Sequence, residues 1–163
     1  MSVNIEAIIA VDEDYGLAKN GKIPWKNRED MKFFKQKTIG NIVVMGSKTL
    51  LSFPNQAPLG NRYNIVLTNN KQEFIEKYSS YNNIGFYNYE ELMNYINNIE
   101  TDRTIYIIGG KQVYDLLLPK CSKIFLSIIY DTYDCDLKLE LNLEKYKIIE
   151  QSANTFRLFC LTL

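Results

Sequence analysis

The stretch with the clearest chemical potential is NGKIPWKNREDMKFF, residues 20–34. It holds the only tryptophan, Trp25, behind a proline, and a carboxylate, Asp30, follows five positions later. Helical spacing predicts that Asp30 and Phe34 lie one turn apart on one face, with Met31 beside them. Such a ring can stack on a flat heterocycle while the acid pairs with its N–H edge. Apolar surroundings raise the pKa of a carboxyl, which suits proton delivery.

The same acid also has a purely structural explanation. Asn27 can cap the helix that follows, and Asp30 at the third helical position can complete an arrangement like a capping box. Capping would account for both residues without any chemistry. The pattern therefore leaves a structural and a catalytic role open.

Two other stretches place glycines where a predicted strand gives way to a predicted helix. Free backbone N–H groups at a helix start favour an anion, so both are candidate phosphate sites, although each could be an ordinary turn. The first is not a Walker loop, because the upstream glycine is missing. The residues are Gly46, Ser47, Lys48 and Thr49 in VVMGSKTLLSF (43–53), and Gly109 and Gly110 in IYIIGGKQVYDLLLP (105–119).

Arg62 is one of four arginines and comes just before an apolar strand, in APLGNRYNIVLT (57–68). Its planar guanidinium could hold a carboxylate through two parallel hydrogen bonds. A surface ion pair is the structural alternative for such a residue.

Composition excludes several classes of function. Histidine is absent, which excludes Ser-His-Asp and Cys-His catalysis and any histidine-built metal site. Nineteen basic and nineteen acidic residues cancel, so we expect neither nucleic acid nor a membrane surface as partner. The three cysteines lack metal-binding spacing, and we expect no metal and reduced thiols. The N-terminus lacks a charged leader and the apolar runs are short, which predicts a cytoplasmic protein.

The length of 163 residues suits a single domain spanning residues 1–163. Apolar, β-branched runs alternate with helix-like segments, and the last three runs have no helices between them. We therefore predict an α/β fold with a mostly parallel central sheet, flanking helices and a C-terminal antiparallel hairpin, with ligands where strands end. The predicted strands are 4–11, 41–45, 63–68, 104–108, 123–130, 145–152 and 155–163, and the predicted helices are 28–37, 47–53, 71–78, 89–98 and 111–119.

These motifs occur in an order that resembles the dihydrofolate reductase family over nearly the whole chain. GLAKNGKIPWKNREDMKFFKQKT resembles the family's mobile loop and first helix, and the other three stretches resemble its Met-Gly-basic-basic-Thr, Ile-Gly-Gly and Pro-Leu-Pro-Gly-Arg segments. Three positions depart from the pattern. Ser47 stands at the first basic position, Lys111 replaces a third glycine or serine, and Gly60-Asn61 replaces Pro-Gly.

The resemblance implies NADPH-dependent reduction of 7,8-dihydrofolate to tetrahydrofolate for one-carbon metabolism, with hydride transfer to C6 and protonation at N5. It implies a monomeric or weakly associated protein in which residues 16–25 form a loop that closes over the site and contacts Asp136 in a later hairpin. The implied catalytic residues are Asp30, Trp25 and Ser127. The implied substrate-binding residues are Ile8, Ile9, Ala10, Met31, Phe34, Phe53, Leu59, Arg62 and Ile108. The implied cofactor-binding residues are Ala10, Asn20, Gly21, Ile23, Gly46, Ser47, Lys48, Thr49, Thr68, Asn69, Ile108, Gly109, Gly110, Lys111, Gln112, Val113 and Tyr114.

Two other functions remain open on the same scaffold. One is a pyrimidine reductase of riboflavin synthesis, although its ribityl-phosphate substrate needs neither Asp30 nor Arg62. The other is a folate-binding or structural protein without turnover, which a fold alone does not exclude.

Overall fold

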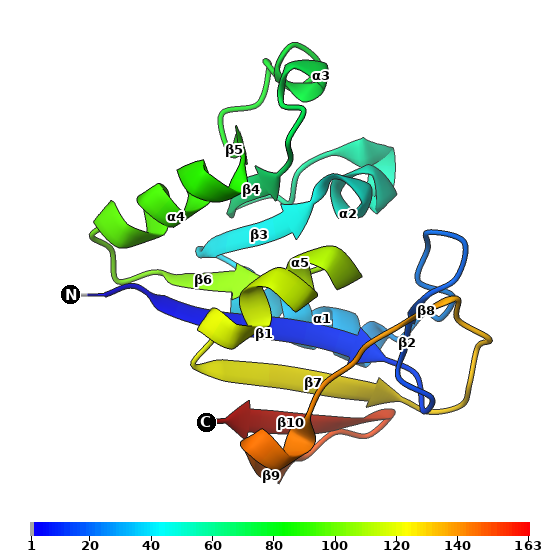
Figure 1. Ribbon diagram of the computed structural model, residues 1–163. Coiled ribbons are helices and arrows are strands. Elements are labelled where there is room, and N and C mark those ends of the chain that lie inside the picture. The colour runs from blue at the N-terminus through cyan, green and yellow to red at the C-terminus, as the bar shows by residue number, and fades with distance from the viewer. Residues whose placement is uncertain (1) are drawn as a thin grey trace.

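The computed structural model describes residues 2–163, and its centre is an eight-stranded sheet (Figure 1). The strands lie in the order β5-β4-β3-β6-β1-β7-β10-β9. β10 runs antiparallel to β7 and β9, and the other neighbouring strands pair in parallel. Their bounds are β1 (Asn4–Val11), β3 (Ile42–Gly46), β4 (Tyr63–Leu67), β5 (Ile84–Tyr87), β6 (Thr104–Ile107), β7 (Lys123–Ile129), β9 (Lys147–Gln151) and β10 (Phe156–Thr162).

β1 lies between β6 and β7 and is the strand on which the site depends. Its register pairs Ala7 with Ile107 on one side and Ala10 with Ser127 on the other. Most β1 side chains are buried, as expected for a parallel strand covered on both faces. The carboxyl ends of β1, β3, β4 and β6 therefore meet at one edge of the sheet.

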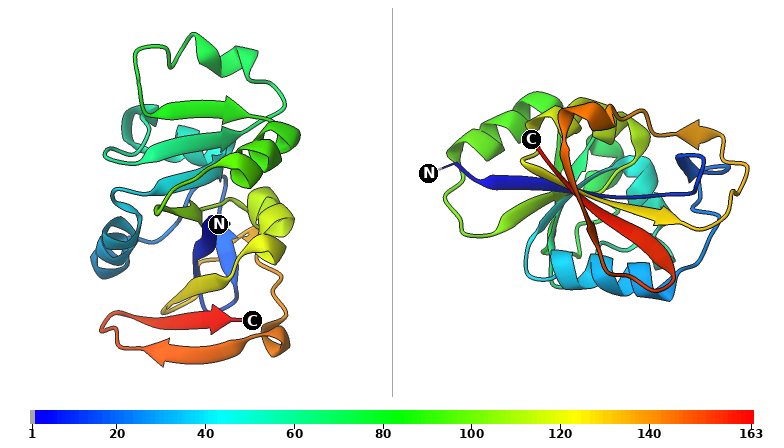
Figure 2. Two further views of the ribbon diagram at one scale, coloured as in Figure 1. Left: turned by 90° about the vertical axis from the view of Figure 1, so that its left-hand side faces the viewer. Right: turned by 90° about the horizontal axis from the view of Figure 1, so that it is seen from below.

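Helices cover both faces of the sheet (Figure 2). Phe34 of α1, Leu50 of α2 and Phe74 of α3 join one apolar cluster, whereas Leu92 of α4 and Leu117 of α5 join the cluster on the opposite face. The helices are α1 (Arg28–Thr38), α2 (Ser47–Ser52), α3 (Gln72–Ile75), α4 (Tyr89–Asn98) and α5 (Lys111–Leu117), with single 3-10 turns at Pro54–Gln56, Leu118–Lys120 and Leu143–Lys145.

The predicted fold class is confirmed, including the C-terminal hairpin of β9 and β10. The expected helix over 71–78 is too long, because α3 ends at Ile75 and turns follow it. β5 and a second, two-stranded sheet of β2 (Gly16–Ala18) and β8 (Leu137–Lys138) were not predicted. These strands have two to four residues, too few to show a hydrophobic period. Among residues 2–163, no helix has the length and apolar character needed to cross a membrane.

Candidate functional site

Asp30 lies in the first turn of α1, and the structure separates its backbone role from that of its side chain. The Asn27 side chain caps the helix by accepting a hydrogen bond from the Asp30 backbone N–H at 2.9 Å. The Asp30 carboxylate does not complete a capping box. Instead, its Oδ1 accepts a hydrogen bond from Ser127 Oγ at 2.7 Å, across from α1 to β7. The structural explanation therefore accounts for Asn27 but not for the acid.

The surroundings of this carboxyl favour its protonated form. Burial raises the pKa of Asp30, the bond from Ser127 acts in the opposite direction, and the charge of Glu29 raises it further. Ser127 is fully buried. In this histidine-free chain, a carboxyl with a raised pKa is a suitable group for holding a proton near neutral pH.

An apolar cluster lies on the face of the sheet that α1 covers. Five of the predicted substrate-binding residues belong to the same cluster on this face: Ile8, Phe34, Phe53, Leu59 and Ile108. All except Ile8 are only partly buried, so their side chains remain accessible to a flat ligand. Met31 is 58% exposed. The structure thus brings together residues from β1, α1, the segments after α2 and the end of β6.

Ile9 is placed differently from the other predicted substrate residues. Its side chain is fully buried in the cluster on the opposite face, beneath α4 and α5. Only the backbone of Ile9 can therefore face the cluster beneath α1. Ala10 is half-buried and pairs with Ser127 in the sheet, which places its backbone beside that hydroxyl.

Arg62 lies at the other end of α1 from Asp30. Its Nη1 donates to Thr38 Oγ1 at 3.0 Å and its Nε donates to Gly60 O at 2.9 Å. Burial lowers the pKa of the guanidinium, which still stays charged, and three of its five N–H donors are left for a ligand. Thr38 follows Asp30 by eight residues of helix, about 12 Å. The Asp30 carboxyl and the Arg62 guanidinium therefore lie at opposite ends of α1.

Arg62 also lines a surface hollow of about 470 Å³ at the amino ends of the strands. Two asparagines hold the segment that carries it. Asn64, fully buried, bonds to the N–H and C=O of Leu59 at 2.9 and 3.0 Å, and Asn83 donates to Leu59 O at 3.1 Å. Neither asparagine was predicted to have this role, because asparagines beside a loop look like ordinary turn residues.

The two glycine junctions lie side by side at the carboxyl edge of the sheet. Gly46 N donates to Gly109 O at 2.8 Å, and a Cβ on Gly110 would lie 3.7 Å from Thr49 Oγ1. Neither α2 nor α5 has a side-chain cap at its start, which leaves backbone N–H groups free for an anion. The first turns of α2 and α5 therefore begin next to each other at the carboxyl edge of the sheet.

Close packing explains two of these glycines. A Cβ on Gly46 would lie 3.3 Å from Val113 Cγ2, and one on Gly109 would lie 3.1 Å from the Tyr114 ring. Gly109 also has φ of 112°, and its peptide bond to Gly110 is cis. A side chain at either position would press against α5, so the close contact between the strand ends and this helix requires glycine there.

Tyr114 is a fully enclosed part of this junction. Its hydroxyl donates to Ile8 O at 2.7 Å, joining α5 to β1, and burial raises its pKa. Lys111 forms an ion pair with Asp115 one turn along α5 at 3.3 Å. Val113 is buried. The other predicted cofactor residues near the carboxyl edge are at least partly accessible, and they are Ser47, Lys48, Thr68, Asn69 and Gln112.

The loop of residues 16–25 contacts a later segment of the chain, as expected. Asn20 N donates to Asp136 Oδ2 at 2.9 Å, and Asp136 N donates to Ala18 O at 3.0 Å. Asn20 and Gly21 have φ of 51° and 77°, and Ile23 is 62% exposed. Asp136 thus holds the loop at Ala18 and Asn20, whereas Ile23 further along is exposed.

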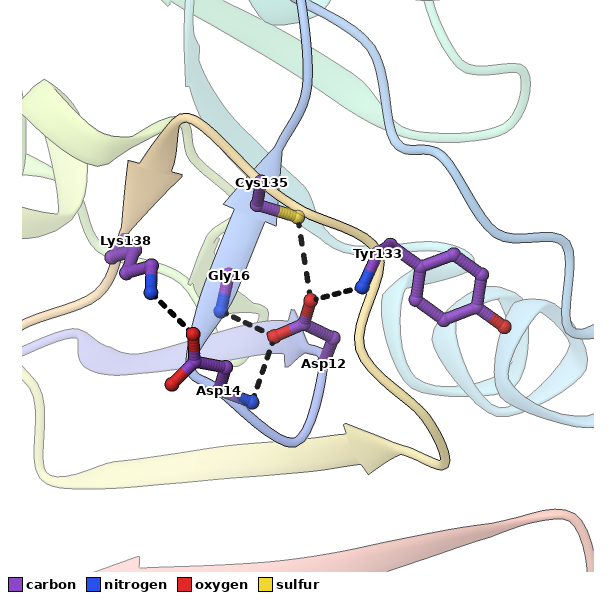
Figure 3. A network of polar contacts seen from close by, with 6 residues as sticks. All are labelled: Asp12, Asp14, Gly16, Tyr133, Cys135 and Lys138. Atoms are coloured by element: carbon purple, nitrogen blue, oxygen red, sulfur yellow. Dashed lines mark hydrogen bonds and ion pairs between the residues drawn. The ribbon is translucent and has the colours of Figure 1, made fainter.

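One further acid, Asp12, was missed. It follows β1 directly, is almost fully buried, and accepts hydrogen bonds from both the 12–16 turn and the 131–137 segment (Figure 3). In the sequence it resembles an exposed turn acid, because Glu13 and Asp14 follow it. No group of three or more acidic or cysteine side chains among residues 2–163 is placed to hold a metal ion.

Comparison with known proteins agrees with this geometry. The family model described as dihydrofolate reductase matches residues 4–156. The chain is 32% identical to a dihydrofolate reductase of Buchnera aphidicola over 95% of this chain and 88% of that protein. It is 28% identical to the dihydrofolate reductase of Ureaplasma parvum over 85% of this chain and 83% of that protein. It also matches the bifunctional dihydrofolate reductase-thymidylate synthase of Paramecium tetraurelia at 33% identity, spanning 30% of that protein's length.

A solved structure gives the same result. The dihydrofolate reductase from Enterococcus faecalis complexed with NADP(H) and RAB-propyl superposes with a TM-score of 0.78 and 27% identity, covering 98% of this chain and 95% of that one. The fold and the family match thus define an NADPH-dependent oxidoreductase. The chain belongs to the dihydrofolate reductase family.

Proposed function

We propose that Asp30, Trp25 and Ser127 form the proton-handling part of this NADPH-dependent dihydrofolate reductase. The observation that carries the proposal is the bond from Ser127 Oγ to the half-buried Asp30 carboxyl at 2.7 Å. Asp30 would pair with the 2-amino group and N3 of the pterin and promote protonation at N5, through a water held by Trp25. Its raised pKa suits that task near neutral pH.

The substrate would lie along α1. The pterin would stack against Phe34 beside Met31 and the backbone of Ile8, Ile9, Ala10 and Ile108, and the benzoyl group would pass between Phe53 and Leu59. Arg62 would bind the α-carboxylate of the glutamate tail with its free N–H groups. The separation along the helix and the shared apolar cluster support this arrangement.

The cofactor would lie across the carboxyl edge of the sheet. When bound, NADPH supplies the hydride for C6 of the substrate. The glycines at positions 46, 109 and 110 would let backbone approach its phosphates and nicotinamide, and Ser47, Lys48, Thr49, Lys111, Gln112, Thr68 and Asn69 would contact its other groups. Tyr114 and Val113 would support that surface from beneath, and Ala10, Asn20, Gly21, Ile23 and Ile108 would close it.

The proposal also covers the loop, the domain organisation and the partners of the protein. The loop of residues 16–25 would exclude water when it closes. We further propose that residues 1–163 form one domain, that the protein acts as a cytoplasmic monomer, and that its partners are dihydrofolate and NADPH rather than nucleic acid or membrane. Neutral net charge supports the last point.

The test is NADPH oxidation by the purified protein on addition of dihydrofolate, with and without methotrexate. Methotrexate-sensitive oxidation supports the proposal. Binding of methotrexate without any oxidation would favour a folate-binding protein, and turnover of a phosphorylated aminopyrimidine instead would favour a pyrimidine reductase.

Ser127→Ala is expected to shift the pH dependence of turnover upward. The Ser127 bond lowers the pKa of Asp30, so its removal raises that pKa and keeps the carboxyl protonated at higher pH. The measurement is the rate of NADPH oxidation against pH. Ser122→Ala, at an exposed serine before β7, should leave the profile unchanged. A downward shift in Ser127→Ala would contradict this electrostatic account.

Lys48→Ala is expected to lower catalytic efficiency with NADPH by roughly two- to fivefold and to leave that with NADH unchanged, because one exposed charge contributes little. Lys48 is exposed at the start of α2, and serine at position 47 leaves it as the only cation there. The measurement is kcat/KM with both cofactors, with Lys120→Ala as the control. Equal kcat/KM values of the unmodified protein with NADPH and NADH would refute the expected preference for NADPH.

A further inference from the structure

Asp12 is a buried carboxylate outside the proton-handling group, and it accepts hydrogen bonds from the turn that leads into β2 and from the segment after β7. It is 1% exposed. Its Oδ1 accepts from Gly16 N at 2.7 Å and from Asp14 N at 2.9 Å. Its Oδ2 accepts from Tyr133 N at 2.9 Å and from Cys135 Sγ at 3.6 Å (Figure 3). Oδ1 thus binds the backbone at the start of the 16–25 loop, and Oδ2 binds the segment that follows β7.

The two segments that Asp12 joins are packed without space between them. A Cβ on Gly16 would lie 2.4 Å from Cys135 Cβ, so only glycine fits at this position. Burial opposes ionisation of Asp12, but the backbone N–H groups of Gly16, Tyr133 and Asp14 outweigh it and lower its pKa. The group therefore stays an anion and accepts from every donor around it. Lys138 and Asp14 add an ion pair on the exposed side.

Tyr133 connects this anion to the proposed site. While its backbone N–H is held by Asp12, its ring points away from Asp12 (Figure 3) and contacts the Trp25 indole. The two ring centroids are 5.6 Å apart and the planes are inclined by 56°. Both rings pack on a small cluster of Ile129, Phe156 and Leu158 at the end of the sheet.

We infer that Asp12 is a positioning residue for Trp25. Its carboxylate fixes the backbone of Tyr133, and the Tyr133 ring fixes the indole. This link is separate from the contact between Asn20 and Asp136, which holds the same loop at another point. The inference rests on the proposed function only in giving Trp25 a part in the reaction.

The test uses Asp12→Asn in the full-length protein. Asparagine keeps the size of the side chain but turns one acceptor oxygen into a donor that faces N–H or S–H groups, so one half of the network is lost. Trp25 is the only tryptophan, so the tryptophan emission reports its packing directly. We expect red-shifted emission, stronger quenching by acrylamide, and a kcat lower by about tenfold, with an unchanged pH midpoint. Asp134→Asn, an exposed acid in the same segment, is the matched control and should change none of these.

Two substitutions at Tyr133 separate positioning from general stability. Tyr133→Ala keeps the N–H that Asp12 binds but removes the ring, and it should reproduce the emission change and the loss of kcat. Tyr133→Phe keeps the ring and should behave like the unmodified protein. If Asp12→Asn fails to fold, unchanged emission and kcat in Tyr133→Ala would still overturn the inference, because the link from Asp12 to Trp25 runs through this ring.

The outcomes are distinguishable. In the double variant Asp12→Asn/Tyr133→Ala, losses no greater than those of either single variant support one shared route, whereas additive losses overturn it. A lower Tm in Asp12→Asn with unchanged emission and kcat would reduce Asp12 to a structural role. If Trp25→Phe keeps full kcat, the proposed role of Trp25 fails, while the emission of Asp12→Asn still tests whether Asp12 positions the indole.

Discussion

Asp30→Asn is expected to slow hydride transfer near neutral pH by roughly 10²- to 10⁴-fold, the range that general acid catalysis contributes. Asparagine still accepts the Ser127 bond, so the pocket keeps its shape while the titratable proton is lost. The measurement is the single-turnover rate of NADPH oxidation with dihydrofolate. Asp14→Asn, an exposed acid that pairs with Lys138, is the control and should remain within a factor of about two, as expected for a surface pair. Unchanged turnover in Asp30→Asn would remove the role assigned to the acid.

The same substitution is expected to change stability in a pH-dependent way. The folded-state pKa of Asp30 is raised above its ordinary value of 3.8, so the stability linked to this carboxyl is fully present below that value. It is lost as pH rises through the folded-state pKa. Asp30→Asn should therefore have a higher Tm than the unmodified protein at neutral pH, and this gain should disappear in acid. Thermal melts across that range measure it, and a gain that is constant with pH would contradict the buried-carboxyl account.

Arg62→Leu is expected to weaken dihydrofolate binding by roughly 10- to 100-fold, because hydrogen bonds between charged groups contribute about 1.5–3 kcal/mol. A pterin substrate that lacks the glutamate tail should bind and react as before. The measurement is KM and kcat with both substrates.

Arg157→Leu is the control for this prediction, since Arg157 pairs with Glu150 on the exposed hairpin. It should leave both substrates unaffected. Equal losses with the tailed and tailless substrates in Arg62→Leu would show that the arginine supports the fold rather than the tail. The bond from Arg62 to Thr38 makes this comparison necessary, because leucine also removes that link.

The sequence predicted the parts of the site that depend on local spacing. Helical periodicity placed Asp30 and Phe34 on one face, and both glycine junctions fall where a strand ends and a helix begins. Spacing did not predict the contact between the two glycine junctions. That Gly46 meets Gly109 follows from β3 and β6 being neighbours, and strand order is a tertiary property.

Other features could not be predicted because the deciding partner is distant in sequence. Asp12 resembles any polar turn residue until the segment near Tyr133, about 120 positions later, buries it. The direction of a strand side chain depends on register, so Ile9 belongs to the opposite face from Ile8. The ring of Tyr114 lies beneath Gly109, a contact that only the packed junction reveals.

The central position of β1 has a consequence for how the protein acquires activity. Its partners are β6 and β7, with Asn4 paired to Thr104 and Ala10 to Ser127, so about 100 residues of chain must be made before this strand is paired. Such long-range pairing slows folding and leaves an apolar strand exposed meanwhile. During synthesis, the growing chain is therefore vulnerable to self-association until β7 has emerged. A ligand that binds both Asp30 and Ser127 can stabilise only chains that include β7, so it should raise the yield of the full chain without rescuing nascent forms that end before β7.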